Sequence, residues 1–177
     1  MSIYTKNGDS GKTSLLSKRV RKSDYRIELN GQIDELMVML AFLIEDLKEN
    51  DEFVNSLKLV YKNLFKITSM IADVNKQMNL ELDTQEVNEL ETEIDEMSLS
   101  LPKLKHFIYY TGSYKSMKCQ EIRAKVRSVE RTAVRLFDVE GIDNNILTYL
   151  NRLSDYFYTL GRYLNLLEGN EEDILNL

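Results

Sequence analysis

The sequence is poor in the residues that interrupt helices and in those that most often perform catalysis. It contains one proline and seven glycines in 177 residues, so little of it can be turn or loop, and long helices are favoured. A single cysteine, Cys119, excludes an intramolecular disulfide and suits a reducing compartment. The single histidine, His106, lies close to Pro102 in a segment that we expect to be a loop.

Long apolar runs and an excess of positive charge are also missing. The formal net charge is −6, which disfavours a general nucleic-acid or anionic-membrane binder. No apolar run approaches the roughly 18 residues of a membrane span, and the first residues have no signal-peptide core. We therefore expect a cytoplasmic protein, and the length predicts one domain.

Apolar residues at three- and four-residue steps predict five helices. Residues 1–24 form a polar lead, expected to be a loop of the same domain, and 25–177 form the helical domain. The expected helices cover about 25–47, 53–78, 83–97, 113–137 and 143–167, with Asp83 and Asp143 as N-caps. The acidic segment 168–177 should fray, and no pattern calls for a sheet. An all-α, antiparallel five-helix bundle follows.

The polar lead contains a candidate phosphate-binding loop at Thr5–Ser14, with two glycines, two lysines and several hydroxyl or amide side chains. Glycines let backbone N–H groups approach an anion, and ammonium groups complete the cradle. A Walker A motif needs a glycine five residues before Gly11, where Lys6 stands, so the P-loop interpretation fails. The alternative is a flexible polar arm.

Four arginines recur every fourth residue on the fourth helix, at Arg123, Arg127, Arg131 and Arg135. They share one face, and like charges at this spacing oppose the helix by about 0.2–0.5 kcal/mol per pair. We expect compensation by a bound polyanion or by carboxylates, with Asp34 and Glu35 placed at the edge of an apolar face. A solvated basic face and an RNA-binding face are the alternatives.

The bundle architecture is ferritin-like, but a di-iron site is excluded. That site needs Glu-x-x-His motifs on two helices, and the residue three before His106 is Lys103.

Several segments together resemble PduO-type ATP:cob(I)alamin adenosyltransferases. The N-terminal signature corresponds to 5–15, and a second motif runs from Arg26 to Leu36. The family's arginine helix corresponds to 123–131, and Asn151-Arg152-Leu153-Ser154-Asp155 matches its last helix. The family usually reads Pro-Gly-Gly-Ser before the arginine helix, with a histidine ahead of the first arginine; this chain has Tyr110-Thr111-Gly112-Ser113 and Gln120.

The resemblance implies a homotrimer that binds ATP between subunits, with Mg²⁺ on the phosphates, and transfers the adenosyl group to a reduced corrinoid (cobalamin). It makes Arg127 and Lys6 the catalytic residues. It places Asp34 and Arg123 at the subunit interface and Phe107 against the corrinoid. The ATP site would comprise Thr5, Lys6, Asn7, Gly8, Thr13, Ser14, Lys22, Arg127, Glu130, Arg131 and Asn151. A reductase and an enzyme that uses adenosylcobalamin are expected partners, and a non-catalytic nucleotide- or corrinoid-binding bundle protein is the alternative.

Overall fold

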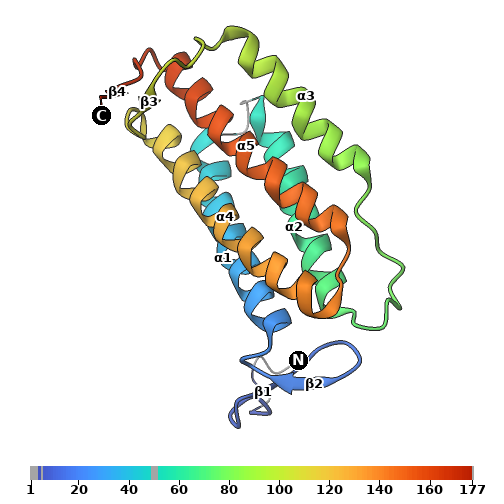
Figure 1. Ribbon diagram of the computed structural model, residues 1–177. Coiled ribbons are helices and arrows are strands. Elements are labelled where there is room, and N and C mark those ends of the chain that lie inside the picture. The colour runs from blue at the N-terminus through green and yellow to red at the C-terminus, as the bar shows by residue number, and fades with distance from the viewer. Residues whose placement is uncertain (1–3, 5, 49–51, 177) are drawn as a thin grey trace.

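The computed structural model describes Tyr4, residues 6–48 and residues 52–176, and within these ranges the chain forms five helices (Figure 1). Helix α1 packs against α2 and α4, and α5 packs against α3 and α4. In Figure 1, α1 runs antiparallel to both of its neighbours and α4 runs antiparallel to α5, while α3 and α5 run in the same direction. The all-α five-helix bundle is confirmed. The helices are α1 (Tyr25–Leu47), α2 (Phe53–Ala72), α3 (Thr84–Ser100), α4 (Tyr114–Glu140) and α5 (Asn144–Leu167).

Side-chain caps begin the helices where the sequence predicts them. Asp83 accepts the backbone N–H of Gln85, and Asp143 accepts that of Asn145, which satisfies amide groups that no helical partner can reach. Ser113 caps α4 by accepting the N–H of Ser116 at 3.1 Å. Helix α4 continues to Glu140, three residues beyond its predicted end.

The second helix is shorter than predicted, because α2 ends at Ala72 rather than near residue 78. The buried Asp73 carboxylate accepts the backbone N–H of Met78 at 2.6 Å, a local bond that competes with helix continuation. Lys76 and Asn79 then take positive φ angles of 53° and 47°. Val74 and Met78 continue the apolar spacing of the helix, so the pattern predicts a longer α2 than the structure contains.

Two small antiparallel sheets correct the expectation that the chain contains none. Strands β1 (Lys12–Ser14) and β2 (Arg19–Arg21) form a hairpin in the polar lead, and β3 (Phe107–Ile108) pairs with β4 (Ile174–Leu175). The prediction that the C-terminal segment frays is therefore wrong for the residues that the structure describes. The two sheets lie at opposite ends of the bundle (Figure 1).

The core is apolar and continuous along the bundle. Its largest fully buried side chains include Tyr149, Tyr156 and Phe157 of α5, and the Tyr156 hydroxyl donates to Glu93 at 3.0 Å. Helices α4 and α5 approach closely at Gly161, where an added Cβ would lie 2.7 Å from Gln120 Nε2. None of the helices in the described ranges has the length and apolarity required to span a membrane.

Candidate functional site

The N-terminal hairpin, residues 6–22, concentrates positive charge. It contains six lysines or arginines and one carboxylate, Asp9. The Lys22 N–H donates to the Gly11 carbonyl at 2.9 Å, and Gly11 takes the positive φ (72°) that this turn requires. A Cβ on Gly8 would lie 3.3 Å from Lys22 Nζ. The hairpin thus brings together Gly8 and Lys22, two of the predicted nucleotide-site residues, and the Lys22 ammonium lies against the face of Gly8 that has no side chain.

Of the other predicted hairpin residues, Lys6 and Asn7 precede β1, whereas two lie within that strand. Lys6 has a positive φ of 57°, and Thr13 and Ser14 lie in β1, with Ser14 opposite Arg19 of β2. The Arg19 guanidinium donates to the Asn7 carbonyl and fixes the start of the loop. Sequence reasoning missed Arg19, although the alternating Arg-Val-Arg at 19–21 was a short strand signal. Thr5 lies outside the described residues.

A second group of predicted residues lines one surface hollow, which we call the α4 hollow. Its volume is about 490 Å³. The Asn151 side chain on α5 donates to Glu130 Oε1 on α4 at 3.0 Å, which fixes the orientation of both groups. All four α4 and α5 residues predicted for the ATP site lie here, together with two that were not. The hollow is lined by Arg127, Glu130, Arg131, Val134, Arg135 and Asn151.

The cations of the α4 hollow are not neutralised within the chain. Across Tyr4, 6–48 and 52–176, the ion pairs within 4.0 Å include none of Arg127, Arg131 and Arg135, and all three side chains are exposed. Of the two expected forms of compensation, carboxylates do not supply it within the described part of one chain, where Glu35 pairs with Lys125. Compensation by a bound polyanion stays a prediction. Three exposed, unpaired guanidinium groups on successive turns are suited to a polyanion such as a triphosphate.

Arg123, one turn before Arg127, is held in place by its own chain. Its Nε donates to Gln120 Oε1 at 2.8 Å, and its guanidinium lies 4.7 Å from the centre of the Tyr110 ring and 5.8 Å from that of Tyr158. Gln120 is buried against α5. Cation–π contacts with two rings add to this anchoring. Partial burial raises the pKa of the Tyr158 phenol despite the nearby Arg162 and Arg123, so Tyr158 stays neutral at physiological pH.

Asp34, the predicted partner of Arg123, lies exposed on α1 and forms no ion pair in the part of the chain that the structure describes. One chain therefore does not bring Asp34 and Arg123 into contact.

Phe107 lines a pocket with aromatic walls, which we call the aromatic pocket, at the β3–β4 end of the bundle. The Phe107 side chain is 73% exposed, and the pocket, of about 730 Å³, also has Tyr110, Tyr158 and Leu175 in its walls. The sequence did not predict Tyr158 or Leu175 as site residues. Neither belongs to a motif, and Leu175 reaches the pocket through the pairing of β3 with β4, which joins distant segments.

The predicted nucleotide residues fall into two groups that one chain keeps apart. The hairpin precedes Arg26, which pairs with Glu140 at 2.7 Å at the end of α4. Arg127 lies thirteen residues earlier on α4, about 20 Å along the helix axis. Within one chain the hairpin and Arg127 therefore lie at different levels of the bundle, whereas Arg123 and Arg127 link the aromatic pocket to the α4 hollow.

Comparisons with known proteins identify the family of this chain. The family model for cobalamin adenosyltransferase matches residues 3–164. A corrinoid adenosyltransferase of Bacillus subtilis is 35% identical over 172 residues, which are 96% of this chain and 89% of the relative. The corrinoid adenosyltransferase MMAB of Homo sapiens is 35% identical over 180 residues, covering 97% of this chain and 72% of that protein.

A solved structure extends the likeness to three dimensions. It is a variant PduO-type ATP:corrinoid adenosyltransferase from Lactobacillus reuteri, complexed with cobalamin and ATP. It matches with a TM-score of 0.93 at 28% identity, covering 99% of this chain and 100% of that one. The chain belongs to the cobalamin adenosyltransferase family.

Proposed function

We propose that this protein is an enzyme that transfers the 5′-deoxyadenosyl group of ATP to the cobalt of reduced cob(I)alamin. The observation that carries the proposal is the α4 face on which Arg123 borders the aromatic pocket while Arg127, one turn further, opens the α4 hollow. An adenosyl transfer needs a metal-bearing macrocycle and a polyphosphate side by side. Family membership and the likeness to a complex with both cobalamin and ATP support the same reaction.

The reaction is a displacement at carbon. The cobalt(I) electron pair attacks C5′ of ATP, a cobalt–carbon bond forms, the C5′–O bond breaks, and inorganic triphosphate leaves with both electrons of that bond. No proton has to move in this step, so no general base and no nucleophilic side chain is required. Cys119 fits this scheme as a bystander, because complete burial raises the pKa of its thiol and keeps it protonated.

The protein's task is to align C5′ with cobalt and to stabilise the leaving triphosphate. Arg127 and Lys6 act on the charge that develops during transfer, and Glu130, Arg131 and Asn151 hold ATP from the bundle side. Mg²⁺ is carried on the phosphate oxygens, as is usual for nucleotide-bound magnesium. The hairpin residues Thr5, Asn7, Gly8, Thr13, Ser14 and Lys22 complete the cradle.

The site is shared between subunits of a homotrimer, in which the hairpin of one chain meets the α4 hollow of another. The separation of the two groups along the bundle supports a site that is shared between subunits. A shared site also gives Asp34 a role, since an exposed carboxylate without an ion pair in its own described chain can bridge to Arg123 of a neighbour. Sedimentation of the purified protein tests the trimer, and a monomer that is fully active would contradict it.

Phe107 lies against the corrinoid face opposite the attacked one, and its exposed ring covers the cobalt where water would otherwise bind. The enzyme works in the cytoplasm with a reductase that supplies cobalt(I) and an enzyme that uses the adenosylated product. A reduced, buried thiol is consistent with that compartment.

The test is an assay for cobalt–carbon bond formation from ATP and chemically reduced cobalamin, followed by the visible spectrum of the corrinoid and by release of triphosphate. We expect both signals at equal molar amounts. A protein that binds ATP and cobalamin but forms no cobalt–carbon bond would be a non-catalytic binding protein, and the proposed activity would be rejected.

A further inference from the structure

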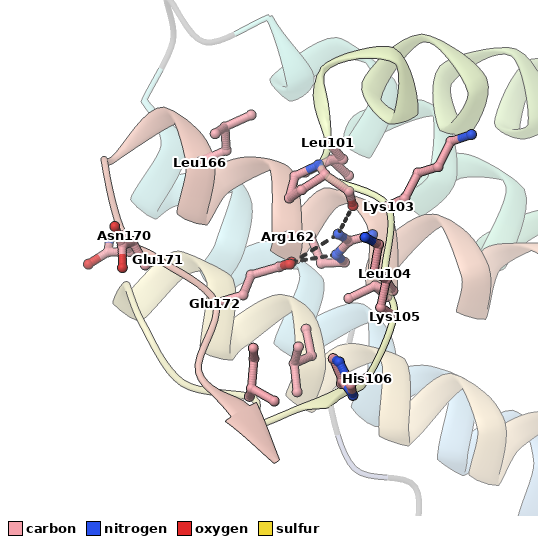
Figure 2. A pocket seen from close by; sticks show the side chains of 13 residues that line it. Leu101, Lys103, Leu104, Lys105, His106, Arg162, Leu166, Asn170, Glu171 and Glu172 are labelled. Carbon is pink, nitrogen blue, oxygen red and sulfur yellow. Dashed lines mark hydrogen bonds and ion pairs between the residues drawn. The ribbon is translucent and has the colours of Figure 1, made fainter. Parts of the chain in front are cut away.

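Figure 2 shows a second cavity, which we call the end pocket, at the β3–β4 end of the bundle. It adjoins the aromatic pocket. It has a volume of about 410 Å³, which is within the range of small-molecule sites. The two pockets share the wall formed by residues 104–106 and 108. The apolar part of the lining consists of Leu101, Pro102, Leu104, Ile108, Leu166 and Ile174.

Polar contacts hold the walls of the end pocket together. The Arg162 guanidinium donates to Glu172 Oε2 at 3.1 Å and to the Pro102 carbonyl at 2.8 Å, so one side chain of α5 joins the C-terminal segment to the loop that precedes β3 (Figure 2). The Tyr109 N–H donates to the Asp173 carbonyl at 2.9 Å beside the β3–β4 pairing. The cavity is thus a built feature with fixed walls.

One part of the proposed substrate, the nucleotide arm of cobalamin, has the size and chemistry to occupy this cavity. Cobalamin carries, besides its macrocycle, an arm of phosphate, ribose and an aromatic base. Cobalt(I) holds no axial ligand, so the base is detached from the metal when the adenosyl group is transferred. A detached aromatic base favours an apolar surface.

The wall that the two pockets share carries the positive charge of Lys105, which suits the phosphate of such an arm. Lys105 and His106 line both pockets, and a phosphodiester that connects a macrocycle in one pocket to a base in the other passes this wall. Lys103 lines the end pocket but not the aromatic pocket, and its amine points away from the cavity (Figure 2).

We propose that the end pocket binds the nucleotide arm of the corrinoid, with the aromatic base against Leu104, Leu166 and Ile174 and the phosphate beside Lys105. The inference rests on the proposed function and adds to it a subsite that distinguishes complete corrinoids from those without the arm. The enzyme therefore prefers cobalamin to cobinamide, the corrinoid that lacks the phosphate, ribose and base.

The first experiment compares the KM of cobalamin with the KM of cobinamide in the wild type and in Leu166→Trp. Leu166 lines the end pocket but not the aromatic pocket. Because its side chain is 42% exposed, a larger side chain at this position fills the cavity without entering the core. We expect the KM of cobalamin to rise about tenfold relative to that of cobinamide. Leu99→Trp is the matched control, because Leu99 lies on α3, 88% exposed and outside both pockets, and the ratio should keep its wild-type value.

The second experiment tests the phosphate contact with two lysines of the same loop. In Lys105→Ala the KM of cobalamin should rise about fivefold relative to that of cobinamide, whereas Lys103→Ala should leave the ratio unchanged. Both side chains are exposed, so neither variant threatens the fold.

The outcomes separate this inference from the proposed function. If the wild type adenosylates both corrinoids with equal KM, or if Leu166→Trp and Lys105→Ala change both KM values alike, the arm does not bind in the end pocket while the enzyme activity stands. If the wild type adenosylates neither corrinoid, the proposed function itself fails.

Discussion

Arg123 and Arg127 lie one turn apart on α4, yet their surroundings differ completely. Arg123 is bonded to Gln120 and stacked on Tyr110 and Tyr158, whereas Arg127 has no ion pair in the described ranges and lines an open hollow. The fold has fixed the cation beside the aromatic pocket and left the cations of the α4 hollow available for a ligand. Substitutions at the first should therefore affect architecture, and substitutions at the second should affect ATP.

The largest effect is expected from Arg127→Ala. If Arg127 stabilises the leaving triphosphate as proposed, its loss should lower kcat/KM for ATP about 100-fold or more. The unfolding temperature should stay close to that of the wild type, because the side chain is exposed. Arg127→Lys, which keeps the charge without the planar fork, should fall in between. Steady-state kinetics measure the activity of each variant, and thermal unfolding measures its stability. Wild-type turnover in Arg127→Ala would show that Arg127 does not belong to the ATP site.

Gly161→Ala should produce the opposite pattern, a loss of stability. Its methyl group would lie 2.7 Å from Gln120 Nε2 and 3.2 Å from the Ser116 carbonyl, so α4 and α5 must separate and the anchor of Arg123 loosens. We expect a decrease of about 1–3 kcal/mol in the free energy of unfolding, measured by urea denaturation. Gly31→Ala on α1 is the control, because nothing lies within 4 Å of the added methyl group and alanine favours the helix; equal effects at the two positions would contradict the close-packing argument.

Arg123→Ala should weaken the oligomer. Arg123 is expected to bridge to Asp34 of a neighbour, so we predict a dissociation constant about tenfold higher, measured by sedimentation at several protein concentrations. Gln120→Ala keeps Arg123 but removes the acceptor that orients it, together with a donor to the Tyr158 carbonyl, and should weaken assembly less. An unchanged trimer with unchanged activity in Arg123→Ala would refute the bridging role.

The smallest effect is that of ionic strength. The α4 hollow is open to solvent, so salt should screen its attraction for ATP and raise the KM of ATP about threefold between about 0.05 and 0.5 M salt. The pair between Arg26, which is buried, and Glu140 is screened less, so thermal stability should change little over the same range. A KM that does not depend on salt would indicate that the arginines contribute little to ATP binding.

Much of the fold was predictable, because helix periodicity and caps depend on neighbouring residues. Asp83 and Asp143 begin their helices as expected. The end of α2 was not predictable in this way, since Val74 continues the apolar spacing and only the Asp73 side-chain bond reveals the break. The pairing of Phe107 with Leu175 connects segments nearly seventy residues apart and has no local signal.

The candidate site shows the same division. The arginine spacing on α4 identified a charged face correctly, but not that Arg135 lies in the same hollow or that Tyr158 stacks on Arg123. These contacts depend on how α4 packs on α5. That the hairpin of one chain meets the α4 hollow of another stays a prediction about the assembly. Contacts between different chains produce no periodic pattern in the sequence of one chain.

The basic patches have a further consequence for how substrate arrives. The whole chain has a formal net charge of −6 although the hairpin and the α4 hollow are cationic, so the remaining surface is more acidic than the net value suggests. Such a surface repels nucleotides that collide elsewhere and lets those near the basic patches diffuse inward. If the two basic patches bind ATP as proposed, the contrast between them and the acidic surface should raise the rate at which ATP is captured, before any specific contact forms.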